Sequence, residues 1–329
     1  MNEKSLKVLE QYEIEVTGTR RGRGSYICET GDGKKLLTDY SGSEKKIRFV
    51  NQVLEHLKEQ GYAPTDMAIA NKEGNLVSYD WEENAYLLKD WQEGRECDIR
   101  SMADIEQAVE SLARLHKMMY LKTDDQEVKK AYTKGNLQLE WQRHNRELRK
   151  VYMYVKKRKQ KNEFEVLFLE NFCQFYDQAL EAEEQLGKSS YQEFYEKGQR
   201  AGEICHGNYN YHNILFLGKR EIFITNFDHC FFNNHVADLY QFLRKVMEKQ
   251  EWSKSVGHRL LELYDRENYL GEEEMAYLSA RLSYPEKFWK LANQYYNCGK
   301  SCIPWKNADN LKILIQQEKQ KAKFLRSMQ

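Results

Sequence analysis

Four polar residues in one short segment have the spacing of a phosphoryl-transfer site. His206 is followed by Asn208 and Asn213, and Asn226 comes after the next apolar stretch. In phosphotransferases the pattern His-x-Asp-x4-Asn places a proton acceptor and a metal ligand on one loop, and an Asp after the next strand binds magnesium. Here amides occupy two positions at which that chemistry needs carboxylates.

These two amides remove charges on which the reaction depends. Asn208 stands at the position of the proton acceptor, and an amide oxygen can orient a hydroxyl but cannot take its proton at neutral pH. Loss of a positioned base typically costs on the order of 10² to 10⁴ in rate. Asn226 stands where the main magnesium carboxylate belongs, and a hard dication prefers charged oxygens. The sequence therefore predicts a degenerate site to which no catalytic residue is assigned.

Neighbouring groups leave weak nucleotide binding open. Asn213 keeps the loop's second metal position, and Asp228 offers a carboxylate two residues after Asn226. These three residues are the candidate positions for weakly held Mg-ATP, although no cofactor is expected to be required and no metal site is assigned. The alternative is that Asn213 and His206 only hold the loop backbone, as buried polar groups often do.

Two further parts of a phosphate site are weak or missing near the N-terminus. The glycine-rich run Gly18–Ser25, with its three arginines, could cover phosphates, but an ordinary hairpin turn explains the glycines more simply. The lysine that such enzymes place on their third strand is absent, because Thr38 stands at that position and Lys34 and Lys35 come earlier.

The composition favours a helix-rich globular protein. The chain has 329 residues, three prolines, and equal totals of 51 Lys plus Arg and 51 Asp plus Glu. Zero net charge argues against a protein held on nucleic acid by bulk charge. The basic run Lys156–Lys159, together with Lys150, is most simply a solvated helix face.

The termini and cysteines indicate synthesis in a cytosol. The start of the chain lacks the apolar core of a signal peptide, and no apolar run approaches the ~20 residues needed to cross a bilayer. Seven scattered cysteines suit reduced thiols. Cys298 and Cys302 are spaced C-x3-C without a second pair nearby, so two helix-end thiols explain them better than a zinc site.

The first part of the chain predicts a small α+β lobe. Residues from about 12 to 40 alternate as hairpins. Ser43 can cap a helix that ends at Gly61. Two further strands are expected at Leu76–Tyr79 and Ala85–Leu88.

The remainder is predicted to be mainly helical. Ser101 caps an apolar stripe, and residues 137–200 have the pattern of two or three long helices. The candidate site at 205–228 interrupts them. The chain therefore divides into a β-rich N-terminal lobe, 1–90, and a helical C-terminal lobe, 91–329, that carries the degenerate loop.

Several further segments give the chain a resemblance to one family. These segments are Tyr86–Asp98, Ala113–His116, Phe168–Phe172, Cys205–Asn208, Tyr284–Trp289, Asn293–Tyr296 and a tail near Phe324 and Leu325. With them the chain resembles the CotS family of spore coat proteins, which are relatives of the aminoglycoside phosphotransferases and choline kinases.

The resemblance implies a two-lobed, protein kinase-like α+β fold and a role in the bacterial endospore coat. It implies synthesis in the mother-cell cytoplasm, deposition in the spore coat, and other coat proteins as partners, with no nucleic acid and no membrane. In the wider fold the Asn208 position carries the catalytic Asp, Asn213 and Asn226 are metal-ligand positions, and Asp238 is a structural residue that braces the loop. Asn208, Asn226 and Thr38 depart from that pattern.

We therefore expect a pseudokinase-like structural or assembly protein that binds partners. Two alternatives stay open. One is a divergent ATP-dependent phosphotransferase acting on a small molecule or sugar, with Asp228 as metal ligand. The other is a nucleotide sensor without turnover.

Overall fold

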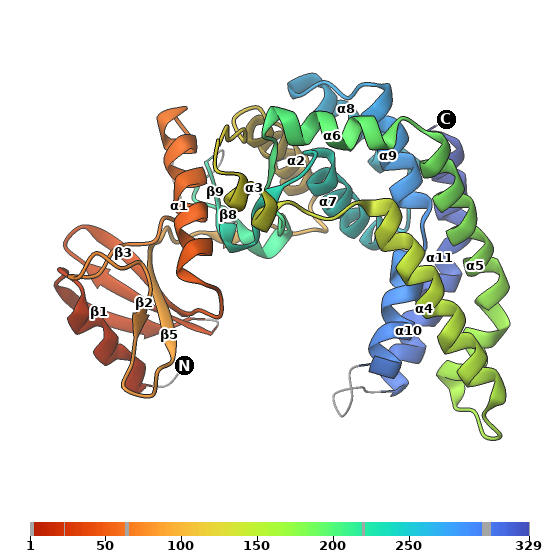
Figure 1. Ribbon diagram of the computed structural model, residues 1–329, viewed down its shortest axis with the longest axis horizontal. Coiled ribbons are helices and arrows are strands. Elements are labelled where there is room, and N and C mark those ends of the chain that lie inside the picture. The colour runs from red at the N-terminus through yellow and green to blue at the C-terminus, as the bar shows by residue number, and fades with distance from the viewer. Residues whose placement is uncertain (1–2, 23, 63–65, 219–220, 298–303, 329) are drawn as a thin grey trace. The chain divides into compact units, whose positions relative to one another are not determined.

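A computed structural model describes residues 3–22, 24–62, 66–218, 221–297 and 304–328 (Figure 1). Contacts divide the chain into two compact units. The first comprises Met1–Tyr132 and Gly202–Phe232, and the second comprises Thr133–Ala201 and Asn233–Gln329.

The first unit is built on a five-stranded antiparallel sheet with the order β1-β2-β3-β5-β4. The strands are β1 (Val16–Arg21), β2 (Ser25–Thr30), β3 (Gly33–Asp39), β4 (Ser78–Tyr79) and β5 (Ala85–Asp90). Because successive side chains of a strand point to opposite faces, the sheet has two distinct surfaces.

One face of this sheet is apolar and the other carries a charge. Cys28 and Leu37 pack with Val8 of the 3-10 helix η1 (Glu3–Gln11) in one buried cluster. Leu36 and Lys89 are directly paired across β3 and β5 on the opposite face. The second face therefore contains a lysine among apolar neighbours.

Two predictions for this unit are wrong in detail. The first hairpin does not begin at residue 12. Tyr12 follows η1 and is buried in the cluster beneath the sheet, and β1 begins at Val16. Of the predicted strand Leu76–Tyr79 only Ser78–Tyr79 pairs with β5. The backbone amides of its first two residues instead donate to the carboxylate of Glu44.

The predicted helix caps are confirmed. Ser43 accepts a hydrogen bond from the Lys46 amide at the start of α1 (Glu44–Glu59), and Ser101 accepts one from the Asp104 amide at the start of α2 (Met102–His116). Each hydroxyl satisfies an amide that the first helical turn leaves without a partner.

Short elements complete the first unit and lead to the candidate site. They are α3 (Gln126–Tyr132), β6 (Arg95–Glu96), β7 (Ile204–Cys205), η2 (Tyr211–Asn213), β8 (Ile214–Phe216), β9 (Ile222–Ile224), η3 (Phe227–His229) and β10 (Phe231–Phe232). Strands β6, β8 and β9 form a three-stranded sheet, and β7 pairs with β10. The segments after β7 and after β9 carry the residues with the phosphoryl-transfer spacing.

The second unit is helical. It contains α4 (Leu137–Lys157), α5 (Glu163–Lys188), α6 (Tyr191–Ala201), α7 (Val236–Lys249), α8 (Lys254–Glu267), α9 (Glu272–Ser283), α10 (Glu286–Asn297) and α11 (Pro304–Arg326). Residues 137–200 thus form three helices. Phe168 and Phe175 of α5 stack on Phe288 of α10 within a buried hydrophobic cluster of this unit. Among the described helices, none combines the length and apolarity needed to cross a membrane.

Candidate functional site

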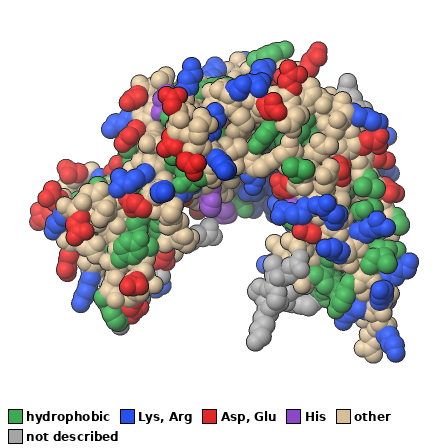
Figure 2. Space-filling view, viewed as in Figure 1, with side chains coloured by type: hydrophobic (Ala, Val, Ile, Leu, Met, Phe, Trp, Pro, Cys, Tyr) green, Lys and Arg blue, Asp and Glu red, His purple; other side chains and the backbone are tan. Residues whose placement is uncertain are grey.

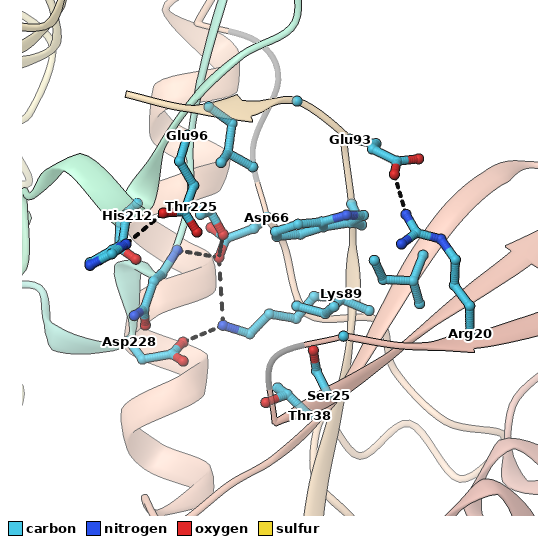
Figure 3. Close-up of a pocket in the computed structure, with 18 residues that line it drawn as sticks. Arg20, Ser25, Thr38, Asp66, Lys89, Glu93, Glu96, His212, Thr225 and Asp228 are labelled. Carbon is cyan, nitrogen blue, oxygen red and sulfur yellow. Dashed lines mark hydrogen bonds and ion pairs between the residues drawn. The ribbon is translucent and has the colours of Figure 1, made fainter. Parts of the chain in front are cut away.

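A cavity of about 460 Å³ lies in the first unit against the charged face of the sheet (Figure 3). It is lined by Arg20, Gly22, Ser25, Ile27, Leu36, Thr38, Asp66, Lys89, Trp91, Glu93, Gly94, Glu96, His212, Asn213, Leu215, Thr225, Asn226 and Asp228. Four of these, Arg20, Ile27, Leu36 and Lys89, are directly opposed on neighbouring strands and form a row across the sheet. Within this row, Lys89 is the buried residue that places an ammonium at the cavity.

That cation holds two carboxylates. The Lys89 side chain is only 4% exposed, and its Nζ lies 2.5 Å from Oδ1 of Asp228 and 3.7 Å from Oδ2 of Asp66. Figure 3 shows the three side chains converging from different segments. Burial opposes the charged ammonium, but the Asp66 and Asp228 carboxylates outweigh it and raise the pKa of Lys89 above its ordinary value. Lys89 is therefore charged.

Asp66 connects this cation to the segment after β9. Its Oδ2 accepts hydrogen bonds from the Thr225 hydroxyl at 3.0 Å and from the Asn226 backbone amide at 2.7 Å. Its Oδ1 is buried and has no hydrogen-bond partner among the described residues. Burial raises the pKa of Asp66 to about 6, because Lys89 lies closer to Asp228 and compensates only in part.

The position of the cation differs from the sequence expectation. Thr38 lines the cavity at the place predicted for the missing lysine, while Lys34 pairs with Glu93 and Lys35 pairs with Asp90. Lys89, one strand further along the sheet, supplies an ammonium instead. The signal for it in the sequence is a lysine that directly follows the apolar run of strand β5, since a charge in a buried strand needs a partner.

The loop that begins at His206 is held by its own polar groups. The fully buried imidazole contacts the Thr225 carbonyl oxygen through Nε2 at 3.1 Å and accepts the Asn208 backbone amide at Nδ1 at 3.1 Å. The ring is therefore neutral, with its proton on Nε2. Gly207 has φ +76°, and a Cβ there would lie 2.2 Å from the carbonyl oxygen of His229. The loop thus depends on both residues.

The amides of this loop also bond within it. The Asn213 amide donates to the Asn208 carbonyl oxygen at 2.8 Å, and the Asn208 side-chain oxygen accepts from the Asn210 amide at 2.8 Å. Asn213 lines the cavity, whereas Asn208 is not among the lining residues. These contacts are the ones expected from the alternative in which polar side chains of the loop hold the loop's own backbone.

The segment after β9 places an amide and a carboxylate at the cavity. Asn226 adopts the left-handed conformation, with φ 70° and ψ 50°, which Asn tolerates better than most residues. Asp228 is 24% exposed and is bonded to Lys89. The pair that could have held magnesium thus consists of a neutral oxygen and a carboxylate already neutralised by an ammonium. These residues do not fit a metal-bound triphosphate.

The glycine-rich hairpin covers part of the cavity, and among its described residues the cation that lines the cavity, Arg20, is paired. Gly22 donates its amide to the Ser25 carbonyl oxygen at 2.8 Å, which closes a tight turn. Arg20 lines the cavity but is paired with Glu93. Arg23 lies outside the described residues.

Asp238 is not among the residues that line this cavity. Asp238 is fully buried in the first turn of α7 in the second unit, and its bracing role stays a prediction. Cys298 and Cys302 lie outside the described residues. In the part of the chain that the structure describes, no cluster of three or more His, Cys, Asp or Glu side chains could hold a metal ion.

Comparison with known proteins identifies the family. Residues 5–328 match the family described as "Spore coat putative kinase YutH". The chain belongs to this family. The match spans nearly the whole sequence, so the predicted resemblance to spore coat proteins with a kinase-like fold is confirmed.

Solved structures confirm the fold. An aminoglycoside phosphotransferase from Alicyclobacillus acidocaldarius has a TM-score of 0.86 at 17% identity, covering 98% of this chain and 94% of that one. A spectinomycin phosphotransferase, solved with ADP and spectinomycin, has a TM-score of 0.67 at 12% identity, covering 97% and 98%. Amicoumacin kinase, solved with AMP-PNP and Ca²⁺, has 0.62 at 15%, covering 98% and 94%. At these identities the likeness concerns the fold, and this member of the spore coat kinase family has the predicted aminoglycoside phosphotransferase-like architecture.

Proposed function

We propose that this protein is a non-catalytic component of the bacterial spore coat that uses its kinase-like fold to bind other coat proteins. Membership of a spore coat family supports the location. One observation carries the non-catalytic part. Asp228, the carboxylate two residues after the predicted metal position at Asn226, is bonded to the buried ammonium of Lys89 at 2.5 Å.

Electrostatics explain why this contact opposes phosphotransfer. A magnesium ion at Asp228 would have to displace an ammonium that is itself buried, and Asn226 would offer the metal only a neutral oxygen. Even with metal bound, Asn208 could not accept the proton of an attacking hydroxyl. The charge arrangement supports a role in which the cavity residues stabilise the fold.

A second candidate is binding of a nucleotide without turnover, and the cavity itself favours it. Its volume of about 460 Å³ lies within the usual range of small-molecule sites, roughly 300 to 1,000 Å³. Among the described lining residues, Lys89 is a buried cation that a phosphate could contact, but its ammonium would have to leave Asp228. Binding through it would therefore not require a metal.

Turnover and binding assays separate these functions. Purified protein is incubated with Mg-ATP and a panel of sugars, amino alcohols and aminoglycosides, and phosphorylated product and released phosphate are measured. We expect none above the background of the Asp228→Asn variant. Turnover in the wild type that Asp228→Asn abolishes would overturn the proposal in favour of a divergent phosphotransferase.

Calorimetry tests the second candidate. ATP is titrated with Mg²⁺ and with EDTA into the wild type and the Lys89→Met variant. The non-catalytic coat role without a ligand predicts no binding heat in any of the four titrations. Metal-independent heat that disappears in Lys89→Met would establish the nucleotide sensor, provided that circular dichroism shows the variant folded.

A sporulating host tests the coat role. A tagged wild-type chain should be recovered in the coat fraction of purified spores, and Asp228→Asn should be recovered equally, because the proposed role needs no phosphotransfer. Absence of the wild-type chain from the coat fraction would contradict the location.

A further inference from the structure

The outer face of α4 is strongly basic. The helix contains six Lys and Arg against two acidic residues, and Arg158, Lys159 and Lys161 follow directly after it. Arg146, Lys150 and Lys157 are exposed and recur at helical spacing, on the side of α4 opposite to its buried residues. We call these three residues the basic stripe.

The basic stripe lacks counter-charges. Among the described residues no ion pair involves Arg146, Lys150 or Lys157, although Arg158 in the following turn pairs with Glu165. Figure 2 shows Lys and Arg side chains gathered over the limb that α4 and α5 form. A local excess of positive charge in a protein of zero net charge provides a surface for an anionic partner.

Exposed apolar groups accompany these cations. Met153 is 48% exposed and Tyr154 is 56% exposed, and both lie between Lys150 and Lys157 on α4. Tyrosine, methionine and arginine are enriched in protein interfaces. The mixture favours a protein partner that has both carboxylates and an aromatic group.

The turn between β4 and β5 has this complementary chemistry. Trp81 is 72% exposed, and Glu82 and Glu83 follow it on the surface. The turn is ordered by Asp80, whose carboxylate accepts hydrogen bonds from Asn84 and from the Tyr86 hydroxyl. We call Trp81, Glu82 and Glu83 the acidic turn.

The two surfaces belong to units of opposite charge. The first unit contains 22 Lys and Arg against 28 Asp and Glu, and the second contains 29 against 23. The zero net charge of the chain therefore consists of an acidic unit and a basic unit. Complementary charges of this kind accelerate and orient association.

We infer that the basic stripe of one copy docks on the acidic turn of a second copy of this chain. The carboxylates of Glu82 and Glu83 meet cations of the basic stripe, so that unlike charges face each other across the contact. The contact joins two different surfaces, so it is heterologous. Heterologous contacts build rings or open chains instead of closed pairs, which is a geometry suited to an extended protein layer.

Charge-reversal variants test this contact. Sedimentation velocity is measured over a concentration series at about 50 mM and about 500 mM salt. Wild-type protein should form larger species as concentration rises, and the higher salt should weaken association on the order of tenfold, since exposed charges are screened. Arg146→Glu/Lys150→Glu/Lys157→Glu and, separately, Glu82→Lys/Glu83→Lys should each remain monomeric at low salt.

A mixing experiment makes the test specific. The two reversed variants, mixed in equal amounts, should associate again, because each restores complementarity to the other. Lys249→Glu/Lys254→Glu/Lys319→Glu makes the same change of charge at exposed positions outside α4 and should associate like the wild type. Unchanged circular dichroism shows that all variants are folded.

Three outcomes would overturn the inference. They are a wild-type chain that stays monomeric at low salt, a stripe variant that still associates, and a mixture that does not. Binding of the wild type to RNA or to anionic vesicles in place of self-association, lost in the stripe variant, would assign the stripe to that other partner. The outcome is independent of the phosphotransfer assays, because neither surface touches the cavity.

Discussion

The loop from His206 to Asn213 and the charge cluster around Lys89 lie in the same unit but use their polar groups differently. In the loop, neutral side chains bond to backbone atoms of the loop and of the next strand. In the cluster, one ammonium and two carboxylates bond to each other across segments that are far apart in the sequence. The loop has the residue spacing of a phosphotransfer site. In the cluster, the charged groups that such a site would turn toward a ligand are bonded to each other.

Under the proposed non-catalytic function, this difference indicates which polar groups of a kinase-like site keep a structural role. The buried imidazole of His206 is needed to shape the chain whether or not a reaction occurs, because buried polar groups must be bonded. A carboxylate at a cavity has no such structural need. In this structure the charge of Asp228 is satisfied by the internal cation Lys89.

The largest expected effect comes from removing the shared cation. Lys89→Met keeps the length of the side chain but leaves Asp66 and Asp228 facing each other without compensation. We expect a loss of about 3 to 5 kcal/mol in the free energy of unfolding, measured with urea. Lys34→Met, which removes a partly exposed partner of Glu93, should cost far less, because exposed ion pairs contribute little to stability. Equal losses in the two variants would show that the cluster has no special role.

The next effect is a dependence of stability on pH. Folding raises the pKa of Asp66 to about 6 from about 3.9 in the unfolded chain. The folded state then holds this proton more tightly, so its contribution to stability is present at low pH and is lost as pH rises from about 4 to about 6. Asp66→Asn, which can still accept from Thr225 and Asn226, should gain on the order of 2 to 3 kcal/mol relative to wild type over that interval.

Urea unfolding of both proteins at several pH values measures this difference. Titration of all other groups cancels in the comparison, provided that the variant is folded. A difference between the two proteins that stays constant from pH about 4 to about 7 would show that Asp66 titrates normally.

A smaller effect is expected when a carboxylate is restored beside the cluster. Asn226→Asp adds a third negative charge near Asp228, and without metal it should lower the free energy of unfolding by about 1 kcal/mol. Magnesium should recover that loss in the variant and leave the wild type unchanged. The matched control is Asn226→Gly, which also tolerates φ 70° but adds no charge. A magnesium response in the wild type would contradict our description of the site.

The smallest effect concerns the loop amide. Asn213→Ala removes one hydrogen bond to the Asn208 carbonyl oxygen, which also accepts from Asn210. We expect a cost of about 0.5 kcal/mol, measured by thermal unfolding, because the carbonyl oxygen keeps its second donor. A cost as large as that of Lys89→Met would remove the distinction between the loop and the cluster.

The fold could be predicted because its signals are local. The caps at Ser43 and Ser101 and the helical periodicity of 137–200 are confirmed. The prediction of a strand at Tyr12 was wrong because a few alternating apolar residues resemble a strand wherever their side chains are buried. In the structure, tertiary packing beneath the sheet determines the conformation of Tyr12.

The candidate site could be predicted only in part. His206, Asn208 and Asn213 are close in sequence, so their spacing indicates a common loop, and the structure brings them together. Asn226 and Asp228 also reach the cavity. The sequence analysis did not predict that Lys89 and Asp66 belong to the site. Strand pairing and the alternation of side chains bring them to Asp228, and no short sequence pattern indicates these long-range contacts.

The bond between Lys89 and Asp228 spans 139 positions of the chain. A ribosome adds about 5 to 20 residues per second, so roughly 7 to 30 seconds pass between the emergence of the two partners. During that interval Lys89 has been synthesised, but of its two carboxylate partners only Asp66 is present. The first unit therefore cannot finish folding until all of α4, α5 and α6 has been synthesised, and its assembly is delayed by the helices inserted within it.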